Sequence, residues 1–406
     1  GTPTSSVLWC TTAKTSPFTA ADQKGYFVNT SGGAVTVTLP SSPTAGDVIA
    51  IKDYADTFDT NNLTICRGGS KISGSTLNPV LDTEGDSIKL IFVDATQGWL
   101  NVQTDDTVKG SPNFIVATGG TISTSGDFKI HTFNSTSSFA ITTAPTPANN
   151  NVSYMVVAGG GGGGGTRGSG AGAGGFREGK TPATPYTASP LVAPAGLPVA
   201  ASTSYPVTVG AGGGVQPNQQ VGIKGSDSVF SSITSGGGGY GADDDKVGGP
   251  GGSGGGGGGG GSYAAGTGNV PPVSPSQGNP GGASGADGRG NQGGGGGGAG
   301  AAGNPNVPSP AGGVGGAGVT SEINASPVAR AGGGGAGGTP GVACGSVGGT
   351  GGGGRGAPRA AGNAPTTAGT ANTGGGGGGA GESPCGNNNV AGIGGSGVVI
   401  IRYKFQ

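Results

Sequence analysis

The chain is poor in the residues that carry most enzyme chemistry. Only 10% of its 406 residues are charged, and it has one histidine, His131, and one methionine. General acid–base catalysis and metal binding draw mainly on histidine and carboxylates. We therefore expect a protein that is not an enzyme and that uses no cofactor and no metal. His131, in the alternating segment FKIHTF, is expected to be a hydrogen-bonded residue of a strand.

Long apolar runs and an excess of one charge are also lacking. No stretch of about 18 apolar residues occurs, so no membrane insertion is expected. The 19 basic and 20 acidic residues nearly cancel, which gives no indication of nucleic-acid binding.

Cysteine is scarce, and its spacing is too wide for a zinc ribbon. The pairings that stay within one region of the chain are Cys10 with Cys66 and Cys344 with Cys385. Each pair is a possible disulfide, and free thiols are the alternative.

Glycine dominates what is present. The chain holds 101 glycines and 28 prolines, and the glycines come in blocks without the strict three-residue period of collagen. A helix is not expected in these blocks, because each glycine costs about 1 kcal/mol relative to alanine. A conventional sheet is not expected either, because glycine has no side chain to pack.

Glycine blocks that lie side by side can adopt an extended left-handed helix of about three residues per turn. This helix has no internal hydrogen bonds, so its peptide groups must pair with neighbouring segments. We predict such a polyglycine II helical bundle over residues 158–396, with exposed loops where Pro, Asn, Ser and Thr interrupt the glycines. A disordered, solvated chain is the alternative.

The remaining segments alternate in polarity as β-strands do. Val35, Val37 and Leu39 fall on one face of a strand, with threonines on the other. Strongly apolar strands at 152–158 and 397–405 bracket the glycine blocks and should form a small sheet at their base. The predicted fold is mainly β plus the polyglycine II bundle, with almost no α-helix. Its parts are an N-terminal all-β module (1–107), connecting and base strands (108–157), the glycine-rich bundle (158–396) and a closing strand (397–406).

One motif matches a phosphate-binding loop, but the residues on either side of it do not suit that structure. Gly174, Gly179, Lys180 and Thr181 satisfy the phosphate-loop pattern. That loop needs a strand before it and a helix after it, so that the helix N-terminus faces the phosphate. Glycines precede the motif and prolines follow it, so we do not expect nucleotide binding.

Recognition is expected in the interruptions between glycine blocks, because loops on a rigid scaffold often carry binding function. Tyrosine beside Ser, Gly and Asn is also the composition of adaptable binding surfaces. The densest charge cluster, 243–246, is either a solvated loop or a calcium site. Since successive segments run up and down, about half of these loops should lie at the far end. The predicted receptor-binding residues are Tyr186, Tyr240, Asp243, Asp244, Asp245, Lys246 and Tyr263.

Several segments together resemble a known family. YMVVAGGGGGGG, GAGGFREG, YPVTVGAGG, SVFSSITSGGGG, GVTSEINASPVARAGGGG and GGSGVVIIRY look like the glycine-rich domain of bacteriophage tail fibres, in the expected order over about 113–406. The N-terminal part, from GYFVNTSGG to GWLNVQ, looks like a β module of phage fibres. The architecture also resembles the receptor-binding tip adhesins of T-even-like phages, whose polyglycine II sandwich displays loops to the host.

This resemblance implies a fibre or tip protein of a virion, found on the virion or extracellularly. Such an adhesin would bind an outer-membrane protein or glycan on a bacterial surface. The β module suggests a homotrimer within a larger fibre. The main alternative is a purely structural fibre, decoration or extracellular filament subunit. Ice binding would need a flat repetitive face, which these irregular blocks do not offer, and no segment points to the paired carboxylates of a polysaccharide depolymerase.

Overall fold

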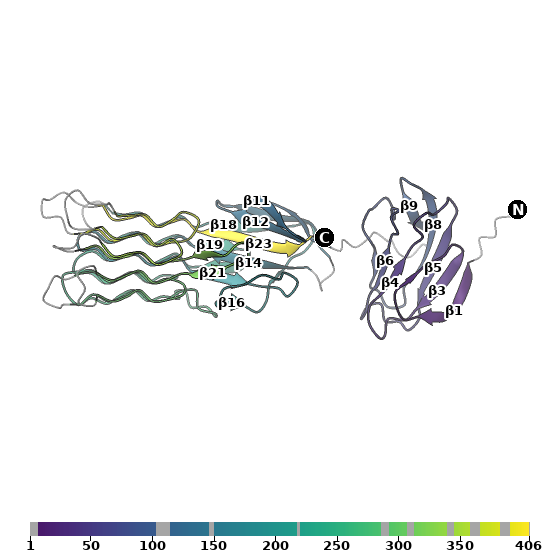
Figure 1. Ribbon diagram of the computed structural model, residues 1–406, viewed down its shortest axis with the longest axis horizontal. Coiled ribbons are helices and arrows are strands. Elements are labelled where there is room, and N and C mark those ends of the chain that lie inside the picture. The colour runs from purple at the N-terminus through teal and green to yellow at the C-terminus, as the bar shows by residue number, and fades with distance from the viewer. Residues whose placement is uncertain are drawn as a thin grey trace. The chain divides into compact units, whose positions relative to one another are not determined.

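The computed structural model describes residues 7–102, 114–145, 150–216, 220–285, 292–306, 312–338, 345–357, 366–381 and 390–405. Over these residues the chain forms strands and extended segments and no helix, which confirms the mainly-β part of the prediction. Contacts divide the chain into two compact units (Figure 1). One is Gly1–Ile115 with Thr143–Asn149, and the other is Val116–Thr142 with Asn150–Gln406.

The N-terminal unit is built from two sheets that enclose one core. The first six strands alternate between the two sheets, and neighbours among them within a sheet are parallel, so each crossover between parallel neighbours passes through the opposite sheet. The last three strands pair antiparallel with their neighbours. The first sheet has the order β1 (Leu8–Lys14), β3 (Lys24–Val28), β5 (Val48–Asp53), β8 (Ser87–Asp94) and β9 (Gly98–Asn101). The second has the order β2 (Phe18–Thr19), β4 (Val35–Thr38), β6 (Leu63–Cys66) and β7 (Val80–Leu81).

The core of this unit takes one face of each strand. In β4, Val35 and Val37 are buried while the two threonines are half-buried, as the alternation predicts. Trp99 is the largest fully buried side chain. Packing of the inward faces of the two sheets is therefore what holds this unit together.

Cys10 and Cys66 are free thiols, which is the alternative that the sequence left open beside a disulfide. Cys10 lies in β1 and Cys66 in β6, which belong to different sheets. Cys344 and Cys385 lie outside the described residues.

The described residues of the second unit contain three sheets. The two apolar strands that bracket the glycine blocks, β14 (Asn151–Val157) and β23 (Val398–Lys404), share the largest sheet, as predicted, and pair with each other along its middle. The largest sheet has the order β11 (Thr121–Ser125), β12 (Phe128–Phe133), β23 (Val398–Lys404), β14 (Asn151–Val157), β15 (Phe176–Gly179) and β16 (Val192–Ala193), and β17 (Leu197–Pro198) also pairs with β14. The second has the order β10 (Val116–Thr118), β13 (Ser137–Thr143), β18 (Thr203–Thr208), β19 (Ser228–Phe230) and β20 (Ile233–Ser235), and the third is β21 (Val319–Ser321) with β22 (Val328–Arg330). We call these three sheets the base.

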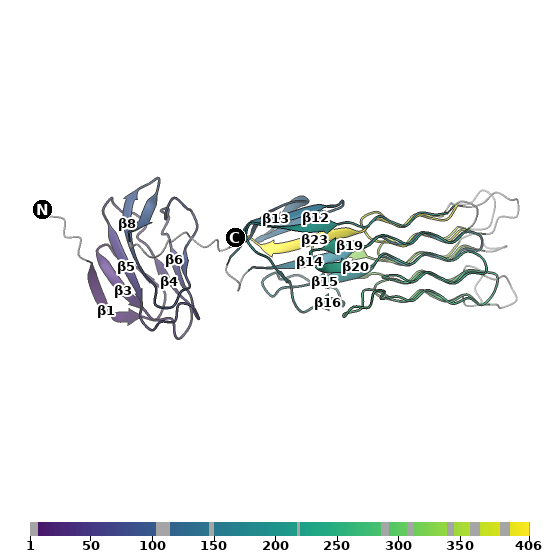
Figure 2. The same cartoon turned by 180° about the vertical axis from the view of Figure 1, so that it is seen from behind.

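The glycine segments leave the base and run side by side, as both views of the ribbon show (Figure 1, Figure 2). Segment 159–165 shows how they are held. Its N–H groups donate in turn to three neighbouring segments, and each neighbour recurs at every third residue. These acceptor segments are 168–175, 220–226 and 390–396. Its carbonyl groups accept hydrogen bonds from three more segments, 211–214, 236–242 and 374–381.

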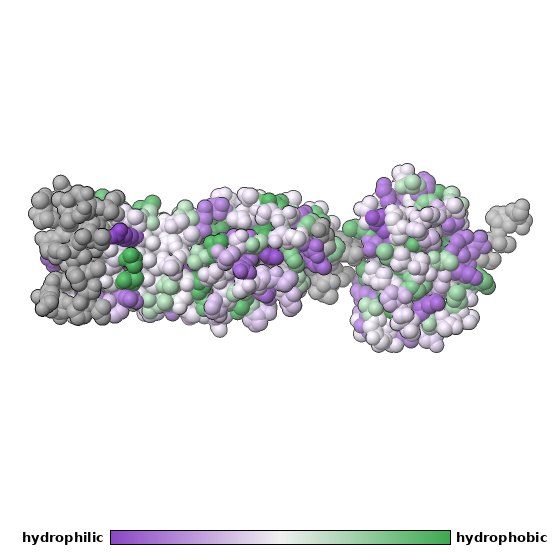
Figure 3. Space-filling model, in the orientation of Figure 1, coloured by the Kyte–Doolittle hydropathy of each residue, from purple (hydrophilic) through white to green (hydrophobic). Residues whose placement is uncertain are grey.

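Glycine is required at successive positions of this segment, because added Cβ atoms would strike the backbones of three different neighbours. A Cβ atom on Gly161 would lie 2.2 Å from the carbonyl oxygen of Gly239. A Cβ on Gly163 would lie 2.1 Å from that of Gly378, in a different neighbour. At the outside the restriction ends, since a Cβ on Gly214 would meet only a side-chain methyl of Ile223, at 3.5 Å. On the face seen in Figure 3, the surface over these segments is largely of intermediate hydropathy.

Candidate functional site

The structure brings five of the seven predicted binding residues together where glycine segments turn back. Residues 243–247 form the turn between two segments, and a second turn at 259–262 lies against it. The Asp245 N–H donates to the carbonyl of Gly259 at 3.0 Å, and the Gly258 N–H donates to that of Lys246 at 3.0 Å. We call this site the polar turn cluster, formed by Arg167, Asp243, Asp244, Asp245, Lys246 and Tyr263.

Arg167 also belongs to the cluster, although it was not among the predicted binding residues. Its carbonyl accepts a hydrogen bond from the Gly259 N–H at 3.1 Å. Its guanidinium lies 3.5 Å from a carboxylate oxygen of Asp244. The sequence feature that could have identified Arg167 is its position as a lone charged residue at the first break in the glycine run, where the chain must turn.

Gly260 allows two carboxylates to approach the backbone. Its φ of +85° lies in the left-handed region that favours glycine. A Cβ atom here would lie 2.3 Å from Oδ1 of Asp245 and 2.5 Å from Oδ1 of Asp244. A side chain at this position would therefore push both carboxylates away.

The charges of the cluster influence one another. Burial raises the pKa of Asp243 above its usual value, and the neighbouring Asp244 charge also raises it. The hydrogen bond from Tyr263 to Asp245 raises the pKa of the Tyr263 hydroxyl. Among the described residues, no group of three or more His, Cys, Asp or Glu side chains could hold a metal ion. The cluster brings carboxylates, cations and a phenol together.

The two other predicted tyrosines have different surroundings. The Tyr240 ring covers Gly249, where a Cβ atom would lie 2.4 Å from ring carbon Cδ1. Tyr186 lies at the base, where its ring is 5.0 Å from the Lys180 ammonium and 5.4 Å from the Arg402 guanidinium. Its segment stays at the base because it connects β15 to β16, and β16 pairs in parallel beside β15. The structure thus leaves Tyr240 and Tyr186 outside the polar turn cluster, and Tyr186 lies at the base.

Glu178 is the centre of a buried polar group beside Tyr186. It is 1% exposed, its Oε1 accepts a hydrogen bond from the Ser321 hydroxyl at 2.6 Å, and its Oε2 accepts one from the Ser189 N–H at 2.9 Å. Burial, assisted by the Glu178 carboxylate, raises the pKa of Tyr186 well above its usual range. Burial lowers the pKa of Arg330, whereas the Glu178 charge opposes that change. This group ties the 178–189 region to β21.

Lys180 of the phosphate-loop pattern also belongs to the base. Its ammonium donates a hydrogen bond to the Tyr186 carbonyl at 2.8 Å. The described residues after Thr181 form turns and short strands and no helix, so the described backbone offers no helix N-terminus for a phosphate. None of the described residues belongs to a helix that is long and apolar enough to span a membrane.

The base sheets, the hydrogen-bonded glycine segments and their turns define a glycine-rich, all-β protein. The chain belongs to the family described as Glycine-rich domain, which matches residues 132–404. The match covers most of the second unit and leaves out the N-terminal sheets. No curated protein matches the chain.

Proposed function

We propose that the glycine segments form a polyglycine II bundle. The hydrogen bonds of segment 159–165 repeat every third residue, the period of that helix, and all of them leave the segment. Six neighbours surround the segment, and added Cβ atoms would strike carbonyl groups in different directions. Both features support a hexagonal arrangement of extended helices and count against a solvated chain.

On this scaffold we propose a fibre or tip protein of a virion that acts as a host-receptor-binding adhesin and not as an enzyme. The observation that carries the proposal is the polar turn cluster, which gathers polar side chains from three separate turns. A scaffold with so many backbone hydrogen bonds would hold these turns in place, which lowers the entropy lost on binding. The partner would be an outer-membrane protein or glycan of a bacterial surface, and the particle would carry the chain as a homotrimer.

Binding to bacteria tests this function. Fluorescently labelled protein is mixed with a panel of bacterial strains, and the amount bound is measured by flow cytometry. We expect strong binding to a few strains and a loss of about tenfold or more when the cluster is neutralised by Asp243→Asn, Asp244→Asn and Asp245→Asn together, because charged anchors often dominate an interface. The matched control removes three exposed carboxylates elsewhere, through Asp59→Asn, Glu84→Gln and Asp127→Asn.

Two outcomes would count against the adhesin. Binding to no strain, or equal loss in both triple variants, would mean that the cluster does not recognise a receptor. The structural alternative, a shaft, decoration or filament subunit, is favoured by the extensive backbone pairing between segments. Immunogold imaging of the particle separates the two, since a tip protein sits at the end of a fibre and a shaft subunit repeats along it.

A further inference from the structure

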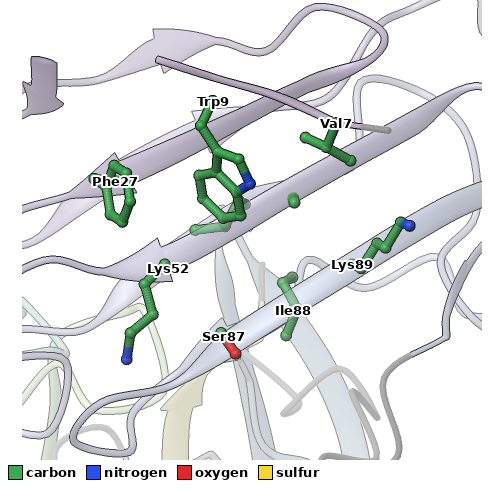
Figure 4. Close-up of a pocket in the computed structure, with 9 residues that line it drawn as sticks. Val7, Trp9, Phe27, Lys52, Ser87, Ile88 and Lys89 are labelled. Atoms are coloured by element: carbon green, nitrogen blue, oxygen red, sulfur yellow. The ribbon is translucent and has the colours of Figure 1, made fainter. Parts of the chain in front are cut away.

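The outer face of the first sheet in the N-terminal unit carries a hollow of about 370 Å³ (Figure 4). It lies on the side of the sheet that faces away from the core. Aromatic rings and lysines surround it. Its lining is Val7, Trp9, Phe27, Ala50, Ile51, Lys52, Ser87, Ile88 and Lys89.

The strand register explains why the surface is hollow there. Trp9, Gly25, Ala50 and Lys89 form one row across four neighbouring strands, β1, β3, β5 and β8. The two middle positions of this row carry the smallest side chains, so the floor is low between the indole and the lysine. The adjacent row on the same face is Phe27, Lys52 and Ser87.

Trp9 lies against the sheet because Gly25 has no side chain. A Cβ atom on Gly25 would lie 2.5 Å from Cδ2 of the indole. The indole nevertheless stays 40% exposed, and its ring centre is 4.9 Å from that of Phe27. Tyr54, 58% exposed, continues the aromatic row at 6.5 Å from Phe27. Exposed aromatic rings held in fixed positions are the usual anchors of binding surfaces.

The charge of the hollow is one-sided. Lys52 and Lys89 flank it, and none of the described residues that line it is acidic. The Lys52 ammonium donates a hydrogen bond to the carbonyl of Gly85, which restricts where it can lie. A ligand of complementary character would present an apolar flat face to the rings and a negative charge to the lysines.

We propose that this hollow binds one sugar residue of an acidic polysaccharide. The C–H face of a pyranose ring would stack on Trp9 and Phe27, and its carboxylate would lie near Lys52 and Lys89. The volume suits a ligand of this size. A nucleic acid also stacks on aromatic rings, but it needs a basic stripe, and the chain has 19 basic against 20 acidic residues. This site lies in a different unit from the polar turn cluster and does not depend on the proposed function.

The two tryptophans of the chain make the test direct. Trp99 is fully buried, so acrylamide quenching of fluorescence reports mainly on Trp9. The probes are trigalacturonic acid and its methyl ester, which keeps the rings and removes the charge. With the full chain, we expect the acid to protect Trp9 from quenching and the ester to bind about tenfold more weakly.

Three variants divide the site into its parts. Trp9→Ala should abolish binding in calorimetry, and Gly25→Val should weaken it by displacing the indole. Lys52→Gln should raise the Kd of the acid about two- to fivefold, as for a charge at the edge of a site, and leave that of the ester unchanged. Leu8→Ala is the matched control, since Leu8 is exposed and neighbours Trp9 on the opposite face of the strand.

Four results would overturn the proposal. They are no protection by the acid, equal affinity for acid and ester, protection by an octathymidine oligonucleotide instead, and protection that rises with protein concentration alone. The last would mean that a second copy of the chain covers the hollow. Circular dichroism shows whether Trp9→Ala folds; if it does not, Lys52→Gln with the two probes still decides the outcome.

Discussion

The Nε2 atom of His131 lies 3.0 Å from the hydroxyl oxygen of Tyr403, 272 positions later in the chain. The other ring nitrogen, Nδ1, lies 2.7 Å from the carbonyl oxygen of Gly119, which can only accept a hydrogen bond. Nδ1 therefore carries the proton, and the neutral ring accepts a hydrogen bond from Tyr403. The prediction that His131 is a hydrogen-bonded strand residue is confirmed, and the pair joins β12 to the last strand of the chain.

The neutral state of His131 predicts that the base loses stability in mild acid. Burial lowers its pKa below the ordinary value of 6.5, and the Lys129 charge lowers it further. The unfolded chain therefore binds a proton near pH 6.5 that the folded chain does not bind. The free energy of unfolding should be constant above about pH 7 and fall below pH 6.5, by at most about 1.4 kcal/mol per pH unit.

Hydrogen exchange of a peptide covering β23, measured from pH 5.5 to 7.5 and corrected for intrinsic rates, checks this. His131→Gln keeps polar atoms at the site but cannot titrate, so its stability should be lower and independent of pH in this window. If wild type and variant show the same slope, another group is responsible.

Glu178 should be among the most sensitive polar positions of the second unit. Glu178→Ala leaves the Ser321 hydroxyl and the Ser189 N–H without their acceptor in a buried place. Loss of a buried charged partner typically costs about 3 kcal/mol. Glu322→Gln, at a half-buried carboxylate close by, should change stability by about 0.5 kcal/mol or less. Guanidinium unfolding followed by tyrosine circular dichroism compares the two, and equal midpoints would contradict the role of Glu178.

The strands could be predicted from sequence because alternation of polarity is a local signal. Strands β14 and β23 do not alternate and were predicted instead from their strongly apolar runs on either side of the glycine blocks, which suggested that they share a sheet. Which segments lie beside 159–165 could not be predicted from sequence, because glycine has no side chain that would distinguish one neighbouring segment from another. Each contact is between backbones, so the pairing is decided by the whole set of segments.

The site was predictable in part for a similar reason. The acidic run 243–246 and Tyr263 stood out as polar residues between glycine blocks, and they meet because both follow segments that run away from the base. The segment that contains Tyr186 resembles the other interruptions in composition. It follows β15, however, and β15 is part of the base. The hollow at Trp9 depends on Gly25 and Ala50 facing the same way on neighbouring parallel strands, and a single sequence does not give that register.

The free thiols predict how the protein reacts with alkylating reagents. Cys10 and Cys66 are both half-buried and unpaired. Iodoacetamide added in denaturant without a reductant should label both completely, as read by mass spectrometry of their peptides. Cys10→Ser should leave the labelling of Cys66 unchanged. A peptide pair joined through Cys10 and Cys66 in unreduced protein would contradict the separate sheets.

Two glycines in neighbouring glycine segments should respond differently to the same substitution to alanine. Gly161→Ala places a methyl group 2.2 Å from the carbonyl oxygen of Gly239, and the backbones on all sides are already hydrogen-bonded, so neither segment can move alone. We expect a loss of about 2 kcal/mol or more in the free energy of unfolding, as for other overpacked interiors.

Gly214→Ala places the same methyl 3.5 Å from a side-chain carbon of Ile223. It should be neutral or slightly stabilising, since alanine restricts the unfolded chain. Guanidinium unfolding of both variants, followed by tyrosine circular dichroism, measures the difference, and a Gly161→Ala variant as stable as Gly214→Ala would show that the segments are not packed backbone against backbone.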